Sequence, residues 1–147
     1  MSVFTSEEIN YLQNQRLARI ATVGPNGQPH VVPVGFRYNP ETDTIDIGGH
    51  NFAERKKWRD VENNPRVAVV IDDIASLNPW RVRGIEIRGH VERLMSGGQS
   101  VVAGFDAPMF RVTPKRIVSW GLNPEPHSWI PTGRSVTYQT SATELDI

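Results

Sequence analysis

Hydrophobic and polar residues alternate along most of this chain, which predicts a protein built mainly from β-strands. Alternation places successive side chains on opposite faces of a strand, one toward a core and one toward solvent. The pattern is clearest over residues 80–94, where Ile85, Ile87 and Val91 share one face and charged residues share the other. The other predicted strands are 17–23, 30–38, 44–47, 66–71 and 110–120. A sheet of six strands is therefore expected.

Short segments rich in turn residues separate these strands. The runs 24–27 and 39–43 combine glycine, proline, asparagine and aspartate, which favours tight hairpins and antiparallel pairing. Pro33 and Gly35 predict a bulge, a sheet edge or a close approach of a ligand to the backbone, and Pro114 predicts a break or bulge in the last strand. A small antiparallel β-barrel is the expected architecture.

Two helices interrupt the strand pattern, one at the N-terminus and one inside the chain. Thr5 followed by Glu8 has the spacing of a capping box, in which each side chain bonds the other's backbone N–H. Asn51 followed by Glu54 repeats that spacing. The internal helix is therefore predicted to begin at Asn51 and to end at Glu62. We expect it to pack across an opening of the barrel.

The length of the chain predicts one domain, over residues 1–123, followed by an extended tail over residues 124–147. Three prolines and many polar residues mark that tail, which would be ordered only by packing on something else. The glycine-bearing segment 95–108 is predicted to be a loop.

Composition excludes several classes of protein. With 16 Lys plus Arg and 16 Asp plus Glu, the formal net charge is zero, which argues against binding to nucleic acid or a membrane surface. The absence of cysteine excludes disulfides and thiol chemistry. The 4 histidines lack metal-ligand spacing, so no metal site is expected. Without a signal-peptide pattern or an apolar run of about 20 residues, a cytoplasmic location is expected.

The segment 48–57 is the strongest candidate for a binding site. Two glycines end a strand, and three consecutive cations, Arg55, Lys56 and Lys57, fall early in the predicted helix. Cations at a helix N-terminus oppose its dipole, by about 0.3–1 kcal/mol each. A bound anion such as a cofactor phosphate would compensate for them. The alternative is a solvated helix face with a Lys56–Asp60 pair one turn apart, and the residues alone leave both interpretations open.

Three segments of the chain resemble the pyridoxamine 5′-phosphate oxidase-like split β-barrel flavoproteins. They are residues 17–38, 55–73 and 80–92. In order and spacing the chain is most similar to the branch of deazaflavin (coenzyme F-420)-dependent enzymes, over residues 5–121. The resemblance implies a mainly β, six-stranded antiparallel split barrel that forms a homodimer with two flavin-type sites at the subunit interface.

The resemblance also implies which residues bind the cofactor. Arg55 and Lys57, with Lys56 between them, match the positions that hold the cofactor phosphate. The positions expected to pass close to the cofactor are Val32, Pro33, Gly48, Gly49 and His50. Glycine at two of them would let a planar ring approach the backbone. The partner chain is expected to add a wall from Trp80, Arg81, Ser119 and Trp120.

The implied activity is that of an oxidoreductase that uses reduced F-420 for hydride transfer to a small organic acceptor. Redox chemistry belongs to the cofactor, so no dedicated catalytic residue is expected. FMN is the alternative cofactor. Pyridoxamine 5′-phosphate oxidase activity itself is disfavoured, because the R-x-H-type pattern near the C-terminus is absent and Arg134 stands alone there. The competing hypotheses are a non-catalytic flavin- or haem-binding protein and a structural domain without a cofactor.

Overall fold

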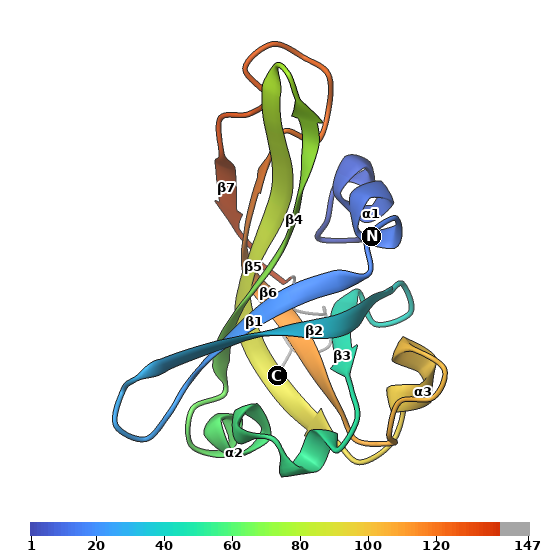
Figure 1. Cartoon of the computed structure of the whole chain (residues 1–147), viewed down its shortest axis with the longest axis vertical. Coiled ribbons are helices and arrows are strands. Elements are labelled where there is room, and N and C mark those ends of the chain that lie inside the picture. The colour runs from blue at the N-terminus through green and yellow to red at the C-terminus, as the bar shows by residue number, and fades with distance from the viewer. Residues whose placement is uncertain (139–147) are drawn as a thin grey trace, which may run out of the picture.

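The computed structural model of the protein describes residues 1–138, which fold into one seven-stranded antiparallel sheet (Figure 1). The strands are ordered β3-β2-β1-β4-β5-β6-β7, and β3 also pairs with β6, which closes a barrel. The strands are β1 Leu17–Val23, β2 Pro29–Asn39, β3 Thr44–Gly48, β4 Arg66–Leu77, β5 Trp80–Leu94, β6 Met109–Trp120 and β7 Thr132–Ser135. The helices are α1 Ser6–Gln13, the 3-10 helix η1 Phe52–Glu54, α2 Lys56–Asn63 and α3 Gly98–Val101.

The six strands predicted from alternation form the barrel, because the residues they point inward are the apolar ones. Ile20, Ile85 and Ile87 are fully buried in the core. The predicted irregularity at Pro114 is confirmed: the pairing of β5 with β6 shifts register between Arg88 and Gly89, and Gly89 lies opposite Pro114. Among residues 1–138, none of the helices is long and apolar enough to cross a membrane.

The N-terminal helix α1 begins as the sequence predicts. The Thr5 hydroxyl accepts a hydrogen bond from the Glu8 N–H at 3.1 Å, and the Glu8 carboxylate accepts one from the Thr5 N–H at 2.9 Å. The same carboxylate accepts hydrogen bonds from the Arg134 guanidinium of β7. Burial alone would raise the pKa of Glu8, but the hydrogen bonds from Arg134 and Thr5 outweigh it and lower that pKa.

Two elements lie in segments for which no regular structure was predicted. The short helix α3 lies inside the predicted loop 95–108, and β7 lies inside the predicted tail. The strand β7 pairs with β6 and is tied to α1 through Arg134, so a partner far away in sequence orders it. The rest of the predicted tail, residues 139–147, lies outside the described residues.

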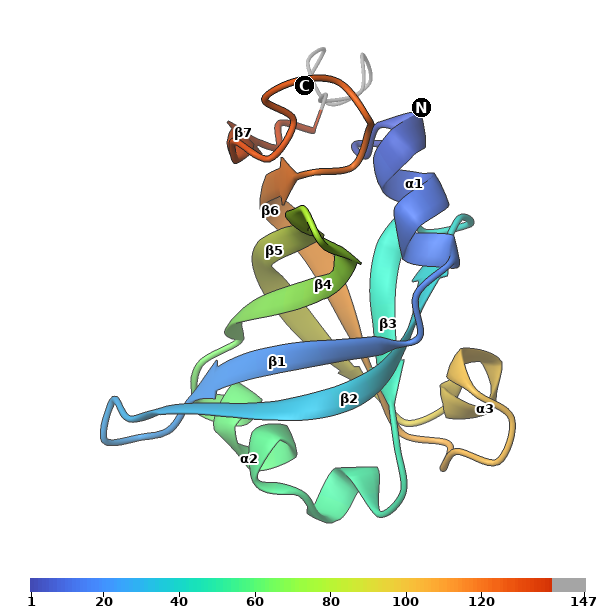
Figure 2. The ribbon, with the colours of Figure 1, turned by 45° about the horizontal axis from the view of Figure 1, so that its top comes forward.

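The predicted start of the internal helix is wrong. Asn51 adopts a left-handed backbone conformation, with φ 51°, and its side chain caps nothing. Asparagine tolerates this conformation better than most residues, so Asn51 turns the chain directly before the 3-10 helix η1 and does not cap an α-helix. The turn leads into η1, Arg55 is extended, and α2 begins only at Lys56. Figure 2 shows η1 and α2 side by side beneath one end of the barrel.

Candidate functional site: a cationic cavity at the start of α2

The eight residues predicted to bind a cofactor from within one chain all line one cavity of about 480 Å³. They are Val32, Pro33, Gly48, Gly49, His50, Arg55, Lys56 and Lys57. The strand β2 supplies one wall, the end of β3 and the turn after it supply a second, and the first residues of α2 supply the cations. The rest of the lining comes from His30, Val34, Gly35, Phe52 and Phe105. The volume lies within the usual range for small-molecule sites, about 300–1,000 Å³.

The three consecutive cations do not share one role. Lys56 donates a hydrogen bond through Nζ to Asp60 Oδ1 at 2.8 Å, which is the i, i+4 pair considered in the sequence. Among residues 1–138, neither Arg55 nor Lys57 forms an ion pair with a carboxylate. Two positive charges at the start of α2 are therefore left for an anion, and the helix has no acidic residue in its first turn.

Lys57 is unusual because its charged side chain is buried. It is 8% exposed, and its Nζ lies 4.9 Å from the centre of the Phe52 ring. Burial lowers the pKa of Lys57, and the nearby Arg55 charge lowers it further. Lysine is rarely buried without a partner, since removing an ammonium group from water is costly. A bound anion would supply the missing partner.

Arg55 lies at the rim of the cavity, and the backbone orients it. Its Nε donates to the carbonyl oxygen of His50 at 3.3 Å, which ties it to the turn after β3. The remaining guanidinium N–H groups can form the two parallel hydrogen bonds that suit a phosphate or carboxylate. Arg55 and Lys57 together therefore combine an exposed planar donor with a buried point charge.

A second polar cluster lies behind the cations. Asp60 is 3% exposed and accepts hydrogen bonds from Lys56 and from the Thr22 hydroxyl at 2.8 Å. His30 Nδ1 lies 4.0 Å from Asp60 Oδ2 and is buried without a hydrogen-bond partner. Burial would raise the pKa of Asp60, but the hydrogen bonds from Lys56 and Thr22 lower it below its ordinary value. This cluster pairs the charge of Lys56 with Asp60, which leaves Arg55 and Lys57 for an incoming anion.

Replacing Asp60 by Asn is expected to lower the free energy of unfolding by about 1–3 kcal/mol near pH 7, because the buried hydrogen bonds lose their charged acceptor. The lowered pKa means that the carboxylate stabilises the fold above its ordinary value of 3.8, and that this contribution is lost as the pH falls through its folded pKa. The gap between Asp60→Asn and wild type should therefore close in acid. Urea unfolding of both proteins from pH 7 to pH 3 measures this difference in the free energy of unfolding.

The matched control is Asp72→Asn on the surface. Asp72 accepts a hydrogen bond from Arg19 at 2.7 Å, but both side chains are more than 40% exposed, at 47% and 43%. We expect this variant to lose no more than about 1 kcal/mol. Equal losses in the free energy of unfolding for Asp60→Asn and Asp72→Asn would show that burial does not increase the contribution of Asp60 to stability.

Phe105 is one of the lining residues that the sequence did not reveal. Gly35 and Gly48 lie opposite each other in the pairing of β2 with β3, which leaves a patch of sheet without side chains. The Phe105 ring covers it: a Cβ added at Gly35 would lie 2.8 Å from Phe105 Cζ, and one at Gly48 would lie 3.0 Å from Cδ2. His50 also packs edge-on against this ring, at 5.4 Å. The space above Gly48, predicted for a cofactor ring, is thus occupied by a protein ring.

The paired glycines indicate in the sequence that a ring packs on this part of the sheet, but they do not indicate which residue supplies the ring. Two glycines opposite each other across a hairpin predict close packing of something flat. The chain returns to them only through the 98–108 segment, where the Asp106 N–H donates to the Gly49 carbonyl oxygen at 3.0 Å. Sequence reasoning could not identify Phe105, since this contact joins residues far apart in the chain.

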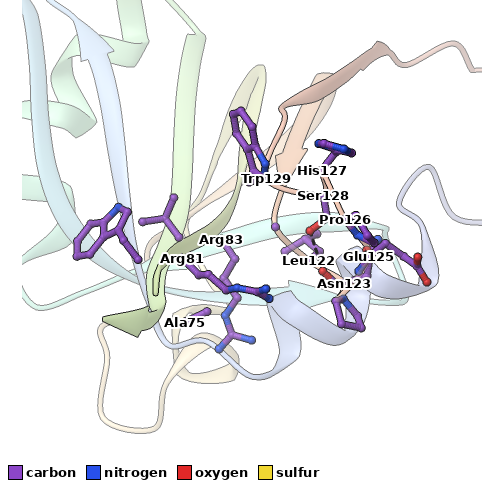
Figure 3. Close-up of a pocket in the computed structure, with 14 residues that line it drawn as sticks. Ala75, Arg81, Arg83, Leu122, Asn123, Glu125, Pro126, His127, Ser128 and Trp129 are labelled. Carbon is purple, nitrogen blue, oxygen red and sulfur yellow. Dashed lines mark hydrogen bonds between the residues drawn. The ribbon is translucent and has the colours of Figure 1, made fainter. Parts of the chain in front are cut away.

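The four residues predicted for the partner-chain wall lie outside this cavity within the chain: Trp80, Arg81, Ser119 and Trp120. Trp80 lines a separate cavity with Arg81 (Figure 3), and Trp120 lines another with Ser119. These residues were expected to reach the cofactor from the partner chain. One chain does not test that expectation, which stays a prediction.

A closed antiparallel barrel with an internal helix packed beneath one end defines the class of split β-barrel proteins. The chain belongs to the pyridoxamine 5'-phosphate oxidase family, whose model matches residues 5–121. The match spans the barrel from α1 to the end of β6 and includes the whole cavity lining.

Comparison with known proteins supports this assignment. The chain is 42% identical over 119 residues to the 5a,11a-dehydrotetracycline/5a,11a-dehydrooxytetracycline reductase of Streptomyces rimosus, covering 81% of this chain and 84% of the relative. A conserved hypothetical protein from Mycobacterium tuberculosis has a similar structure, with a TM-score of 0.65, 18% identity and coverage of 97% and 96%. The FAD binding protein from Mycobacterium smegmatis has a TM-score of 0.60, 18% identity and coverage of 81% and 96%.

Proposed function

We propose that the protein is an oxidoreductase that binds a phosphate-bearing flavin-type cofactor, reduced F-420 in particular, and reduces a small organic acceptor. The observation that carries this proposal is the pair Arg55 and Lys57, two cations without carboxylate partners among the described residues, at the mouth of a cavity with apolar walls. The family and the relative named as a reductase support redox chemistry.

The residues present suit such a cofactor. Arg55 and Lys57 would hold its phosphate, Val32 and Pro33 offer an apolar wall for its ring, and the buried Nδ1 of His30 offers a polar atom without a partner. When bound, the cofactor supplies hydride transfer. The chain binds the anionic end, orients the ring and excludes water from it. No side chain is assigned a proton-transfer role.

F-420 is preferred to FMN for two reasons. The sequence resembles the F-420-dependent branch of the family, and F-420 carries an acidic glutamyl tail in addition to its phosphate. The cationic segment, with Lys57 buried and Arg55 exposed at the rim of the cavity, would then meet more than one negative group of the cofactor.

We further propose that the protein is a homodimer whose interface borders the cavity. On the outer face of the sheet, Val31, Ala21 and Ala68 form a row across three strands. Val31 is 64% exposed, and Leu17 on the same face of β1 is 50% exposed. Exposed aliphatic rows of this kind are typical of interfaces. Pro33, on this face, also lines the cavity, so a partner seated here would border the cofactor. Analytical ultracentrifugation tests the dimer.

Fluorescence titration with F-420 and with FMN tests the cofactor proposal. Wild type should bind F-420 saturably, and Arg55→Gln should weaken binding by at least about tenfold because the charge-assisted hydrogen bonds of the guanidinium are lost. Arg59→Gln is the matched control: this exposed arginine lies on the same helix outside the cavity, and its guanidinium donates to the Glu54 carbonyl oxygen. An unchanged affinity in Arg55→Gln would contradict the proposed site.

Turnover separates an enzyme from a binding protein. Reduced F-420 should be oxidised in the presence of unsaturated polycyclic ketones, quinones or tetrapyrroles, with the first class favoured by the relative's name. Saturable binding without turnover of any acceptor would favour the non-catalytic alternative. Tighter binding of FMN than of F-420 would mean that the cofactor is FMN, and the proposed binding site would stay the same.

A further inference from the structure

The phenyl ring of Phe105 lines the cofactor cavity, and the backbone on both sides of it is held by hydrogen bonds. The Phe105 N–H donates to the Val102 carbonyl oxygen at 3.1 Å. The next residue, Asp106, donates through its N–H to the Gly49 carbonyl oxygen at 3.0 Å and accepts from the Phe52 N–H through Oδ2 at 3.3 Å. The ring is therefore tied to the turn after β3 and to η1, two segments that line the same cavity. Figure 2 shows α3, which begins this segment, beside β3.

Gly35 and Gly48, which together form the glycine patch, are the seat of this ring. Neither has a positive φ, so the backbone conformation does not require glycine at these positions. A Cβ at Gly35 would lie 2.8 Å from Phe105 Cζ, and one at Gly48 would lie 3.0 Å from Cδ2. Both distances are shorter than an ordinary contact between carbon atoms, about 3.5–4.0 Å. The missing side chains thus admit Phe105, and its ring closes the glycine patch to a ligand.

The covered patch shortens the surface that β2 offers to a cofactor. Pro33 and Gly35 lie on the same face of β2, because side chains two positions apart in a strand point the same way. Their Cα atoms are roughly 7 Å apart. The Phe105 ring covers Gly35 on this face and leaves Pro33 in the lining of the cavity. A planar ring that lies against Pro33 therefore meets Phe105 at one end.

Contacts through His50 join Phe105 to the anion-binding side of the cavity. The His50 ring packs edge-on against the Phe105 ring, with centroids 5.4 Å apart and an angle of 80° between the ring planes. The carbonyl oxygen of His50 accepts the hydrogen bond from Arg55 Nε at 3.3 Å. Phe105 and Arg55 are thus both held by one residue, which sets the spacing between the aromatic wall and the proposed position of the phosphate.

We propose that Phe105 sets the position of the cofactor ring: the ring lies on the Pro33 side of the cavity with one end against Phe105, and not above the glycine patch. This inference rests on the proposed function, because it requires a cofactor whose phosphate is held by Arg55 and Lys57. A cofactor that is bound at its phosphate and stopped at its ring has one position along β2. Contacts between the edge of one aromatic ring and the face of another are favourable, so Phe105 contributes to affinity as well as to placement.

Proton NMR of the bound cofactor tests the proposal, because an aromatic side chain in contact with a ligand shifts the signals of the ligand's protons. The ring-proton signals of F-420 should move on binding to wild type, and part of that shift should be absent with Phe105→Leu. Met95→Ala is the matched control: Met95 lies in the same 95–108 segment, is 69% exposed and does not line the cavity. It should reproduce the wild-type shifts. A residue that only supported the fold would leave the shifts unchanged in a variant that still binds.

Affinities show at which end of the cofactor the contact lies. The second ligand is the phosphate-free deazaflavin, which keeps the ring and ribityl chain of F-420 and lacks its anionic groups; riboflavin replaces it if FMN binds more tightly than F-420. Phe105→Leu should weaken both ligands by the same factor, about 3- to 10-fold, because an aromatic contact to the ring is lost. Arg55→Gln should weaken F-420 alone, because the second ligand has no phosphate. Fluorescence titration measures both affinities.

Gly35→Ala tests the same contact with Phe105 in place. Its methyl group would lie 2.8 Å from Phe105 Cζ, so the ring has to move off the glycine patch. We expect this variant also to weaken both ligands by one factor. Urea unfolding of each variant confirms that the titrated protein is folded.

The proposal is overturned if F-420 binds with the expected dependence on Arg55 while Phe105→Leu changes neither the ring-proton shifts nor the affinity of either ligand. That result would leave the proposed function standing. The proposal is also overturned if Phe105→Leu weakens F-420 but not the phosphate-free ligand, since Phe105 would then act on the anionic end. If wild type binds neither F-420 nor FMN, the proposed function itself fails, and this inference fails with it.

Discussion

Lys57→Met is expected to weaken F-420 binding by about 10- to 100-fold and, at the same time, to make the cofactor-free protein more stable. The affinity falls because a buried donor to the cofactor phosphate is lost, and hydrogen bonds to charged groups are worth about 1.5–3 kcal/mol. The stability rises because the free protein no longer buries an ammonium group that has no carboxylate partner among the described residues. Methionine fills a similar volume, so no cavity forms.

The pH dependence of the stability gain checks its cause. The lowered pKa of Lys57 means that the charged form is disfavoured in the folded state. The penalty is fully present below the folded pKa, where the lysine is charged in both states. It disappears as the pH rises from that value toward the ordinary value of 10.5. The advantage of Lys57→Met in urea unfolding should therefore be largest near neutral pH and shrink in alkali.

Lys115→Met is the control for this experiment, because Lys115 is exposed on β6 and lies outside the cavity. We expect it to bind F-420 as wild type does and to keep the wild-type stability. If Lys57→Met binds F-420 with wild-type affinity, Lys57 does not contribute to the binding site. A variant that is less stable than wild type at neutral pH would mean that the ammonium group has a favourable partner in the free protein.

Phe110→Ala is expected to lower the free energy of unfolding by about 3–5 kcal/mol, the usual cost of a large core truncation. Phe110 is fully buried in β6. Its ring is stacked on Trp58 at 5.6 Å and lies edge-on to Phe52 at 4.7 Å. These contacts hold η1 and α2 against the barrel, so the cavity formed by the start of α2 should loosen as well. Urea unfolding and F-420 titration of the same variant measure the two effects.

Ile117→Ala separates the general loss of stability caused by truncating a core residue from a specific loss of affinity for F-420. Ile117 is also fully buried in β6, but it lies opposite Ile87 of β5 and makes no part of the aromatic cluster. A loss of about 2–5 kcal/mol is expected, without a specific loss of affinity for F-420 in the fraction that remains folded. Equal weakening of binding in both variants would mean that the aromatic cluster does not position α2.

Local patterns along the chain predicted most of the fold because they depend on neighbours in sequence. Alternation over residues 80–94 matches β5, and the Thr5–Glu8 capping box forms as expected. The same reasoning failed at Asn51, where two competing conformations, a helix cap and a left-handed turn, suit the residue equally well. It also could not predict β7, whose pairing with β6 is a long-range contact.

By itself, the sequence determined that a cationic segment follows a glycine-bearing strand end, and that this strand lies beside β2. That was enough to predict that these segments lie together at one cavity, since strand order and turn length bring them together. It left open whether the cations bind an anion or form a solvated face. Only the tertiary structure decided which of the cations are paired within the chain, because burial depends on which helix face meets the barrel: Lys56 pairs with Asp60, while Lys57 is buried at the cavity without a carboxylate partner among residues 1–138.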